Sequence, residues 1–430
     1  MDRSLGIVGF VTLMTAMAVS AVGTVTVFAA EGSSAAGISG AADPLAEVAA
    51  PEINDPINEA EMQDLRTIAE QSGMSLEAAI DRYAWNDNFA LAVEEVRERY
   101  PGAFAGAEIV DADHAWIAFA DQAPTEARNV FDGFANNGTG VTVDIRTDVG
   151  FTEADLAAAI EDVHFAIYRM PEVRDAATFY DSEARTITTS VVLKDTAQER
   201  DLNDVRAVAA KSLRNAAGPG VLDDFATSVV RSNSSVAGGN DSSSYHMGGE
   251  DITGCTSGFG TRADSHTSGT RGISTAGHCS NSQTDDGSSL TYRSGHEGTH
   301  GDFQWHTGPK TENDNFYSGS SSSTEVNARD VSGIGFPAVG QSLCKNGITN
   351  KKDCQEVRKL DVCSGGECHL IQMGERLAAG GDSGGPVFWG NTAYGLHKGW
   401  MYDPFWPFDR DLFSRASRID DGIGVYIATN

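Results

Sequence analysis

The first half of the chain combines helical and strand-like patterns of apolar residues. Apolar residues recur at a helical period between Met62 and Ala69, and a second periodic run begins after Ser75 and ends before Pro101. Helices are also expected from Pro124, after Thr152 and over 201–215, and strands over 107–110, 115–120, 141–146, 176–180 and 186–193, with a polar turn joining the last two. This order of elements predicts a mixed α/β region.

The second half of the chain has a different pattern. From about residue 241 it contains short β-like runs separated by glycine and serine turns, with few helical periods. Short strands at such regular intervals are typical of an all-β barrel or sandwich. The stretch 232–249 between the two halves is rich in Ser, Gly and Asn and is typical of a protease-accessible linker. We therefore expect two regions of different architecture.

A long apolar run from Leu5 to Ala30 precedes both regions. It is broken only by small or hydroxyl residues, and 27–29 offers small residues at the positions that a signal peptidase reads. The run is also long enough to span a bilayer. We expect residues 1–30 to be a cleaved export signal, with a retained membrane anchor as the alternative. The Ala-, Gly- and Ser-rich residues 31–50 are expected to form a disordered leader.

The chain is strongly acidic, and its charge is unevenly distributed. It holds 61 acidic and 31 basic residues, a formal net charge of −30. From Gly239 onward there are 23 acidic and 15 basic residues, or −8; the remainder, 38 against 16, carries −22. Because phosphate binding depends on clustered Lys and Arg, this balance argues against a nucleic-acid partner. Lys345, Lys351 and Lys352 are expected to be solvated at the surface.

All the cysteines lie in the last part of the chain. They are Cys255, Cys279, Cys344, Cys354, Cys363 and Cys368. An even number of cysteines confined to one region of an exported chain predicts disulfides. The count alone leaves their pairing open.

The segment 381–386, GDSGGP, is the strongest candidate for chemistry. It places Ser383 in a tight glycine-lined turn, and a peptide hydrolase needs its nucleophilic hydroxyl beside free backbone N–H groups that can hold an oxyanion. The alternative is a glycine-rich β-turn without chemistry, since Gly, Asp and Ser are common turn residues. Upstream, 275–279, TAGHC, places His278 next to a cysteine.

Together these motifs resemble the trypsin/chymotrypsin superfamily of serine proteases, most nearly the secreted bacterial streptogrisin and α-lytic type made with a long pro-region. The resemblance implies a double β-barrel catalytic domain over 241–430, preceded by an α/β pro-region over 31–240. It is strong at the motifs and loose over the pro-region. It further implies that the pro-region assists folding and inhibits the enzyme until it is cut away.

The resemblance also assigns roles to individual residues. Ser383 would be the nucleophile, His278 the general base, and the N–H groups of Gly381 and Ser383 the oxyanion hole. Gly381 lets the backbone point inward without a Cβ clash. Asp302 is the expected acid, because it opens a strand-like alternation of aromatic and polar residues and resembles the Asp-aromatic strand of the family.

Other acids are less suitable partners for the histidine. Asp285, Asp286 and Asp314 lie in polar runs that are typical of solvated loops, and Asp382 is expected to be a buried structural acid.

The segment 296–300, HEGTH, matches a zinc-protease motif that depends on a helix to place both histidines on one face. The neighbouring Gly295, Gly298 and Gly301 make a helix unfavourable here. We therefore expect no metal or other cofactor, and a zinc peptidase using His296 and His300 is only a rival hypothesis.

The resemblance favours a disulfide pairing as well. It implies Cys255–Cys279 and Cys344–Cys354, and it leaves Cys363–Cys368 as a short local bridge. The family often has a bridged cysteine shortly before the nucleophile, but residues 377–380 read LAAG. That bridge is therefore missing.

The substrate pocket is where the sequence departs from the family. Residues 395–400 read GLHKGW. Lys398 therefore stands where the family has a small serine, and Trp400, which follows Gly399, stands where the family often has a glycine. The other wall, near Leu377 and Ala378, has no acid in its sequence, which argues against cleavage after Lys or Arg.

Two interpretations of Trp400 stay open. It either narrows the pocket toward small apolar side chains, unless it swings aside, or it packs on Phe405 or Trp406.

The sequence as a whole predicts a secreted, monomeric serine endopeptidase made as a pre-pro-enzyme. Its expected partners are protein or peptide substrates and its own pro-region, with no nucleic acid and no stable membrane association once the signal is removed. A catalytically silent binding protein on the same fold is the alternative, since Lys398 and Trp400 crowd the expected pocket.

Overall fold

The computed structural model describes residues 56–136, 140–181, 184–197, 199–216, 221–231, 246–309, 312–319 and 328–430. The expected export signal, the leader over 31–50 and most of the linker lie outside the described residues. Among the residues described, no helix has both the length and the apolar character needed to cross a membrane. We call 56–231 the N-terminal segment and 246–430 the C-terminal segment.

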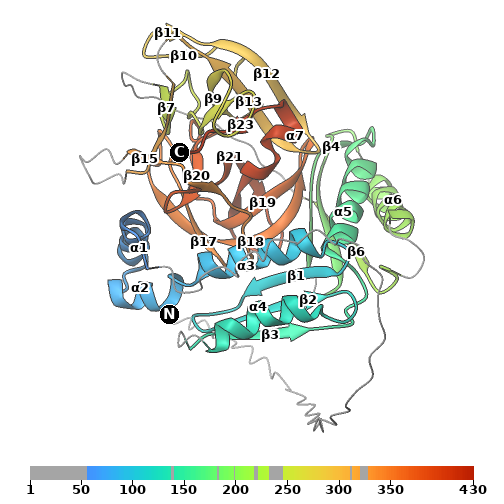
Figure 1. Cartoon of the computed structure of the whole chain (residues 1–430). Coiled ribbons are helices and arrows are strands. Elements are labelled where there is room, and N and C mark those ends of the chain that lie inside the picture. Colours follow the sequence, from blue (N-terminus) through green and yellow to red (C-terminus); the bar gives the residue numbers. More distant parts are fainter. Residues whose placement is uncertain are drawn as a thin grey trace, which may run out of the picture. The chain divides into compact units, whose positions relative to one another are not determined.

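The N-terminal segment has the predicted α/β composition (Figure 1). Its helices are α1 (Glu59–Ser72), α2 (Leu76–Tyr83), α3 (Asn86–Arg99), α4 (Thr125–Asn136), α5 (Glu153–Tyr168) and α6 (Glu199–Ala216). One sheet contains β1 (Phe104–Ile109), β2 (His114–Phe119) and β3 (Thr142–Arg146), and another run of neighbours contains β4 (Val173–Asp181), β5 (Thr186–Leu193) and β6 (Ala226–Arg231). Each expected helix and strand is present, and β6 is an addition.

Local capping explains where two of these helices begin. The Thr152 hydroxyl accepts a hydrogen bond from the N–H of Asp155, whose carboxylate in turn accepts from the N–H of Thr152. Asn58 and Glu61 form the same reciprocal pair at the start of α1. The second helical run predicted from the sequence is divided into α2 and α3 near Trp85, whose indole N–H donates to the carbonyl of Ala112.

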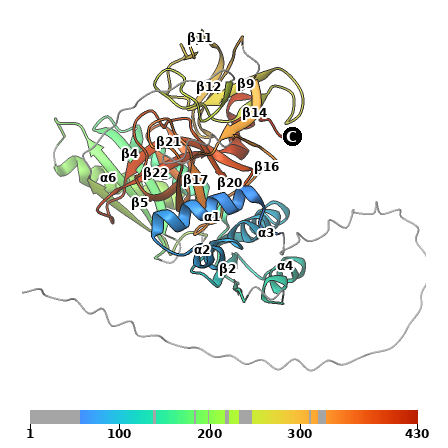
Figure 2. The same cartoon turned by 90° about the vertical axis from the view of Figure 1, so that its left-hand side faces the viewer.

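The C-terminal segment consists almost entirely of strands (Figures 1 and 2). Its first part contains β7 (His246–Gly248), β8 (Gly260–Arg262), β9 (Arg271–Thr275), β10 (Thr284–Asp285), β11 (Ser288–Ser289), β12 (Thr291–Gly298), β13 (Gly301–Thr307), β14 (Glu312–Tyr317) and β15 (Ala328–Asp330). Its second part contains β16 (Gly333–Ile334), β17 (Ser342–Lys345), β18 (Asp353–Ser364), β19 (Glu367–Glu375), β20 (Pro386–Trp389), β21 (Thr392–Tyr402) and β22 (Asp409–Arg415), followed by α7 (Ile419–Ile423) and β23 (Tyr426–Ile427).

Strand pairing divides the C-terminal segment into two halves. In the first half, β12, β13, β9, β8 and β23 form one sheet, and β15, β14 and β7 form another. In the second half, β17, β20, β21, β22, β19 and β18 follow one another, and β18 pairs again with β17, which closes a barrel. The predicted fold class, an all-β domain of the double-barrel type preceded by an α/β region, is confirmed.

The two segments share a sheet and a hydrophobic core. Strand β4 pairs antiparallel with β18 through Thr178 opposite Cys363 and Ala177 opposite Ser364, which extends the barrel sheet into the N-terminal segment. Leu65 of α1 lies in the same buried apolar cluster as barrel residues. The helices and the barrel therefore bury apolar surface together.

Three disulfides join the cysteines in the pairing that the resemblance implied. They are Cys255–Cys279, Cys344–Cys354 and Cys363–Cys368. The first ties the residues just before β8 to the histidine turn after β9. The third closes the turn between β18 and β19, the hairpin that receives β4.

Candidate active site

His278 and Asp302 are in direct contact between β9 and β13. The His278 Nδ1 lies 2.6 Å from Asp302 Oδ2, and the backbone N–H of His278 donates to Asp302 Oδ1 at 2.9 Å. Asp302 is fully buried, and its own N–H donates to Ser414 Oγ. A Cβ at Gly277 would lie 2.7 Å from Asp302 Oδ1, so this close approach requires glycine. Both oxygens of the Asp302 carboxylate thus contact His278, one at the ring and one at the backbone N–H.

Ser383 lies in the turn immediately before β20. Gly381 has φ +97°, a conformation that favours glycine. Thr256 anchors the turn, since its N–H donates to Ser383 O and its hydroxyl donates to Gly381 O. The N–H groups of Gly381 and Ser383 donate to no other protein group in the described part of the chain. Two donors therefore remain available beside the serine hydroxyl.

The serine turn packs against the residues that precede the histidine. A Cβ at Gly384 would lie 2.0 Å from Thr275 Oγ1 and 2.9 Å from Ala276 N, which shows how close the two motifs are. The Ser383 hydroxyl donates to the carbonyl of Lys398 at 3.3 Å. Within the described residues this hydroxyl has no hydrogen bond to His278, so its hydrogen-bond partner is the backbone of β21.

The contact with Asp302 changes the protonation of His278. Burial disfavours the charged imidazolium, but the hydrogen bond and negative charge of Asp302 outweigh it and raise the pKa of His278 above its usual value. Burial alone would raise the pKa of Asp302, yet the hydrogen bond and charge of His278 lower it. The arrangement favours an imidazole that accepts a proton while Asp302 stays ionised.

Lys398 does not project as a free cation into the expected pocket. Its ammonium lies 3.2 Å from Glu367 Oε2 on β19. Burial opposes its charge, but the carboxylates of Glu367, Asp302 and Asp175 raise the pKa of Lys398. Burial raises the pKa of Glu367 and of Asp175, and Lys398 opposes both shifts. Asp175 belongs to β4, so this buried charge cluster includes the N-terminal segment.

A buried acid lies beside Leu377 and Ala378, although the sequence of that wall contains none. The N–H groups of both residues donate to Asp411 Oδ2, at 2.9 and 3.1 Å. Asp411 is fully buried on β22, opposite Trp400, and its Oδ1 lies 3.6 Å from His397 Nε2. Burial raises the pKa of Asp411, but the neighbouring His397 outweighs this and lowers it. Only strand register brings this acid to the wall, so motif spacing missed it.

Trp400 packs on a cation instead of on its aromatic neighbours. The Arg376 guanidinium lies 3.3 Å from the centre of the Trp400 ring. Among the described residues, the ring contact of Phe405 is with Phe179 and the cation contact of Trp406 is with Arg410. Of the two open interpretations of Trp400, packing on Phe405 or Trp406 is supported by no ring contact among the described residues.

Neither the competing acids Asp285 and Asp314 nor the zinc-protease motif has the surroundings that its alternative role would need. Asp285 and Asp314 are buried instead of solvated, and Asp314 forms an ion pair with Arg262. The HEGTH segment forms the end of β12 and the turn into β13, where the N–H of His300 donates to His296 Nε2. The two histidines are therefore not presented on a helix.

The prediction that Lys345 and Lys352 are solvated at the surface is wrong. Asp382 is fully buried, as predicted, and accepts from the N–H groups of Thr349, Asn350 and Ala379. Lys345 is also buried, with its ammonium 3.5 Å from Asp382 Oδ2. Lys352 is buried as well, so the prediction of solvated lysines holds for neither residue.

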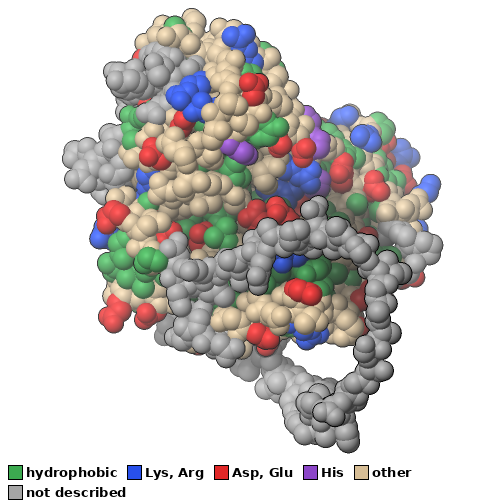
Figure 3. Space-filling model, viewed as in Figure 1, with side chains coloured by type: hydrophobic (Ala, Val, Ile, Leu, Met, Phe, Trp, Pro, Cys, Tyr) green, Lys and Arg blue, Asp and Glu red, His purple; other side chains and the backbone are tan. Residues whose placement is uncertain are grey.

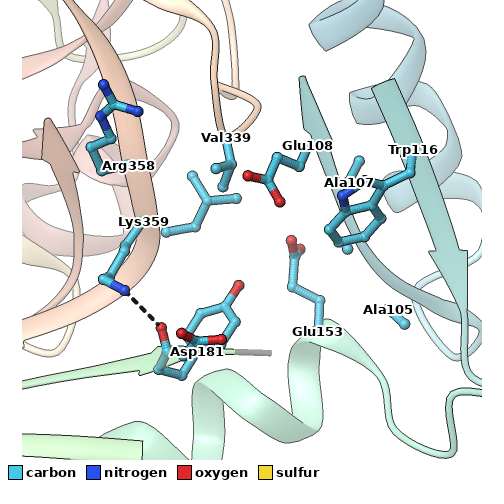
Figure 4. A pocket seen from close by; sticks show the side chains of 12 residues that line it. Ala105, Ala107, Glu108, Trp116, Glu153, Asp181, Val339, Arg358 and Lys359 are labelled. Carbon is cyan, nitrogen blue, oxygen red and sulfur yellow. Dashed lines mark hydrogen bonds between the residues drawn. The ribbon is translucent and has the colours of Figure 1, made fainter. Parts of the chain in front are cut away.

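Ionisable groups also surround a separate cavity of about 200 Å³ (Figure 4). Glu108 and Trp116 of the N-terminal segment line it together with Lys359 of β18, whose ammonium donates to Tyr180 O. Burial lowers the pKa of Lys359. None of the three candidate catalytic residues lines this cavity.

The surface view in Figure 3 shows histidine side chains close to acidic and basic side chains on one face of the molecule.

Three characterised bacterial proteins are similar in sequence. The chain is 29% identical over 160 residues to serine protease 1 of Rarobacter faecitabidus (36% of the chain, 30% of the relative). It is 28% identical over 270 residues to serine protease 1 of Streptomyces fradiae (59% and 66%), and 38% identical over 74 residues to glutamyl endopeptidase 2 of Streptomyces griseus (16% and 39%). The chain thus spans less than two thirds of the length of each relative.

Among solved structures, a Nocardiopsis protease matches with a TM-score of 0.37 and 21% identity, over 43% of this chain and 100% of its own. No protein-family model matches the chain. The sequence relatives agree with the resemblance that the two motifs indicated, because the chain is similar to bacterial proteins named as serine proteases.

Proposed function

We propose that the protein is a secreted serine endopeptidase synthesised as a pro-enzyme. Residues 1–30 would direct export, 31–240 would form the pro-region, and 241–430 would form the catalytic domain. The contact between His278 and Asp302, beside the turn that carries Ser383, is the observation that carries the proposal. A nucleophile, a base and an orienting acid are the parts that acyl transfer requires. We further expect a monomer that acts on proteins or peptides.

The proposed reaction begins with Ser383. Its hydroxyl leaves the carbonyl of Lys398, attacks the peptide carbonyl carbon and gives its proton to Nε2 of His278. Asp302, bound to Nδ1, keeps the imidazole in the accepting tautomer and stabilises the imidazolium. The N–H groups of Gly381 and Ser383 bind the oxyanion. His278 then protonates the leaving amine, and water hydrolyses the acyl-enzyme by the same steps.

The N-terminal segment is proposed to assist folding of the catalytic domain and to inhibit it until the linker is cut. The continuous β4–β18 sheet and the shared apolar core support this role, because a separate domain would not need either. If folding depends on the pro-region, the processed enzyme persists through a high unfolding barrier more than through equilibrium stability.

A catalytically silent binding protein on the same fold is the second candidate. The observation that favours it is the bond from the Ser383 hydroxyl to Lys398 O, which occupies the nucleophile. In that case Ser383→Ala would leave ligand binding unchanged.

Labelling of the secreted, processed chain with a fluorophosphonate probe tests the proposal. Label on the Ser383 peptide, unchanged by EDTA and lost in His278→Ala, is expected for an activated serine. Ser383→Ala is the matched control for label at other serines. A folded, processed chain without label would overturn the enzyme proposal, and loss of peptide cleavage in EDTA would indicate a zinc peptidase instead.

A further inference from the structure

Asp64 of α1 is completely buried, although it carries a charge and belongs to the N-terminal segment. Its Oδ2 accepts from the N–H of Gly390 at 2.7 Å and from Nη1 of Arg329 at 2.9 Å. Its Oδ1 lies 2.9 Å from Nη2 of Arg329 and forms an ion pair with the ammonium of Lys352. All three partners belong to the C-terminal segment. A buried carboxylate needs such compensation, because its desolvation costs several kcal/mol.

The partners of Asp64 together form a receptor for one carboxylate. The side chains of Arg329 and Lys352 are only 5% and 3% exposed. Arg329 is held in place by donating to Gly390 O, and its guanidinium lies 5.3 Å from the centre of the Phe388 ring. The Lys352 ammonium lies 5.8 Å from the same ring. Two cations and one N–H thus converge on a single point, a combination suited to a carboxylate.

Helix α1 lies against the barrel, in contact with β18 and β20 (Figure 2). Gly390 has φ +56°, and a Cβ there would lie 2.9 Å from Cγ of Glu61 on α1. Gln63 accepts a hydrogen bond from Arg329, and at the other end of α1 the Gln71 side chain donates to Asp353 and accepts from Cys354 N. The helix is therefore seated along its length, with Asp64 inside the pocket.

We propose that Arg329, Lys352 and the N–H of Gly390 form a carboxylate-binding pocket on the protease domain, separate from the Ser383 site, and that it retains the pro-region by holding Asp64. The ligand class is an aspartate side chain presented on a helix. The inference rests on the proposed division into pro-region and protease domain. Departure of the pro-region leaves both cations to face solvent or another carboxylate.

The experiment uses the full chain with Ser383→Ala and a recognition sequence for an added protease inserted within 232–245. After a single cut, the rate at which the two fragments separate is followed by size-exclusion chromatography. Asp64→Asn is expected to weaken the complex about a hundredfold or more, because it removes one partner of a buried ion pair. Asp81→Asn, an exposed acid on α2, is the matched control.

Chemical labelling of lysines gives a second readout that does not depend on how well a variant folds. In the cut complex an amine-acylating reagent is expected to modify Lys351 and spare Lys352, and separation of the fragments is expected to expose Lys352. Equal reactivity of Lys352 in complex and separated domain would overturn the proposal, as would equal dissociation of the Asp64→Asn and Asp81→Asn complexes.

A double-mutant cycle assigns the effect to the pocket. Lys352→Gln is expected to weaken the complex much less in the Asp64→Asn background than in the parent. Additive effects would contradict a shared pocket. Because Ser383 is absent throughout, these results are independent of whether the protein is an enzyme, which fluorophosphonate labelling decides separately.

Discussion

Two of the contacts between the N-terminal segment and the C-terminal segment work by different physics. At the sheet contact, β4 pairs with β18, and His164 Nε2 lies 2.8 Å from Gly365 O. At the helix contact, α1 and α3 insert carboxylates into the C-terminal segment. Backbone pairing depends little on side-chain identity, whereas each buried carboxylate requires particular partners. The sheet contact therefore aligns the segments, and the helix contact makes their association specific.

The helix contact uses three carboxylates. Besides Asp64, Asp87 accepts hydrogen bonds from the hydroxyl of Tyr394 and from Gln341 Nε2, and Glu94 accepts from the N–H of Phe336. Asp87 and Glu94 are seven residues apart on α3, so they lie on one face of the helix. Burial raises the pKa of Glu94 to about 7, although hydrogen bonding opposes the shift. This contact therefore becomes less favourable as Glu94 ionises.

The sheet contact has the opposite response to pH. Burial lowers the pKa of His164 to about 4, and the nearby charge of Lys398 acts in the same direction. His164 must stay neutral in the complex, so acid weakens this contact. The two titrations overlap between pH 4.5 and 6.5 and act in opposite directions, so in the parent chain their effects on the association of the two segments largely offset each other.

The largest expected effect separates the chemistry from both contacts. Asp302→Asn should lower kcat about 10⁴-fold, because His278 loses the partner that sets its tautomer. The cut complex carrying Ser383→Ala should survive this change, since Asp302 contacts neither β4 nor the helices directly. The measurements are peptide hydrolysis by the processed protein and fragment dissociation. The matched control is Glu297→Gln, an exposed acid opposite Asp302 on β12. Full activity in Asp302→Asn would contradict the proposed triad.

A smaller effect is expected at the helix contact as the pH rises. The pKa of Glu94 is about 7 in the complex against an ordinary 4.5, so the bound state holds more protons between these values. The contribution of Glu94 to association therefore weakens as pH rises through this range, by up to about a hundredfold. Glu94→Gln should remove this contribution, so that its dissociation profile differs from that of the parent, and Glu77→Gln, an exposed residue of α2, should leave the profile unchanged. A profile unchanged by Glu94→Gln would disprove this assignment.

The smallest effect is expected at the sheet contact in acid. The pKa of His164 is about 4 in the complex against an ordinary 6.5, so the bound state holds fewer protons between these values. The contribution of His164 to association should weaken about tenfold as pH falls from 7 to 5, where the separated segment takes up the proton. His164→Gln should remove this contribution, so that its dissociation profile differs from that of the parent, and His114→Gln on β2 is the control. If the His164→Gln profile matches that of the parent, the sheet contact does not titrate in this way.

Local sequence patterns carried much of the fold. Helix periodicity and the cap at Thr152 indicated the α/β region, because these signals act within a few residues. The motifs around His278 and Ser383 were equally local, and the structure brings both to one place. Asp302 followed from a strand-like alternation together with the resemblance to the Asp-aromatic strand of the family, and both are visible among neighbours in sequence.

Apart from Asp382, whose burial was predicted, only the tertiary structure decided which charges are buried. Lys352 looked like a surface residue, yet it meets Asp64, which lies far away in the sequence and on a helix of the other segment. Asp411 reached the wall near Leu377 through the register of β21 and β22. A charge is stable inside a protein only when a partner compensates its desolvation, and that partner is fixed by packing between distant elements, not by the residues on either side.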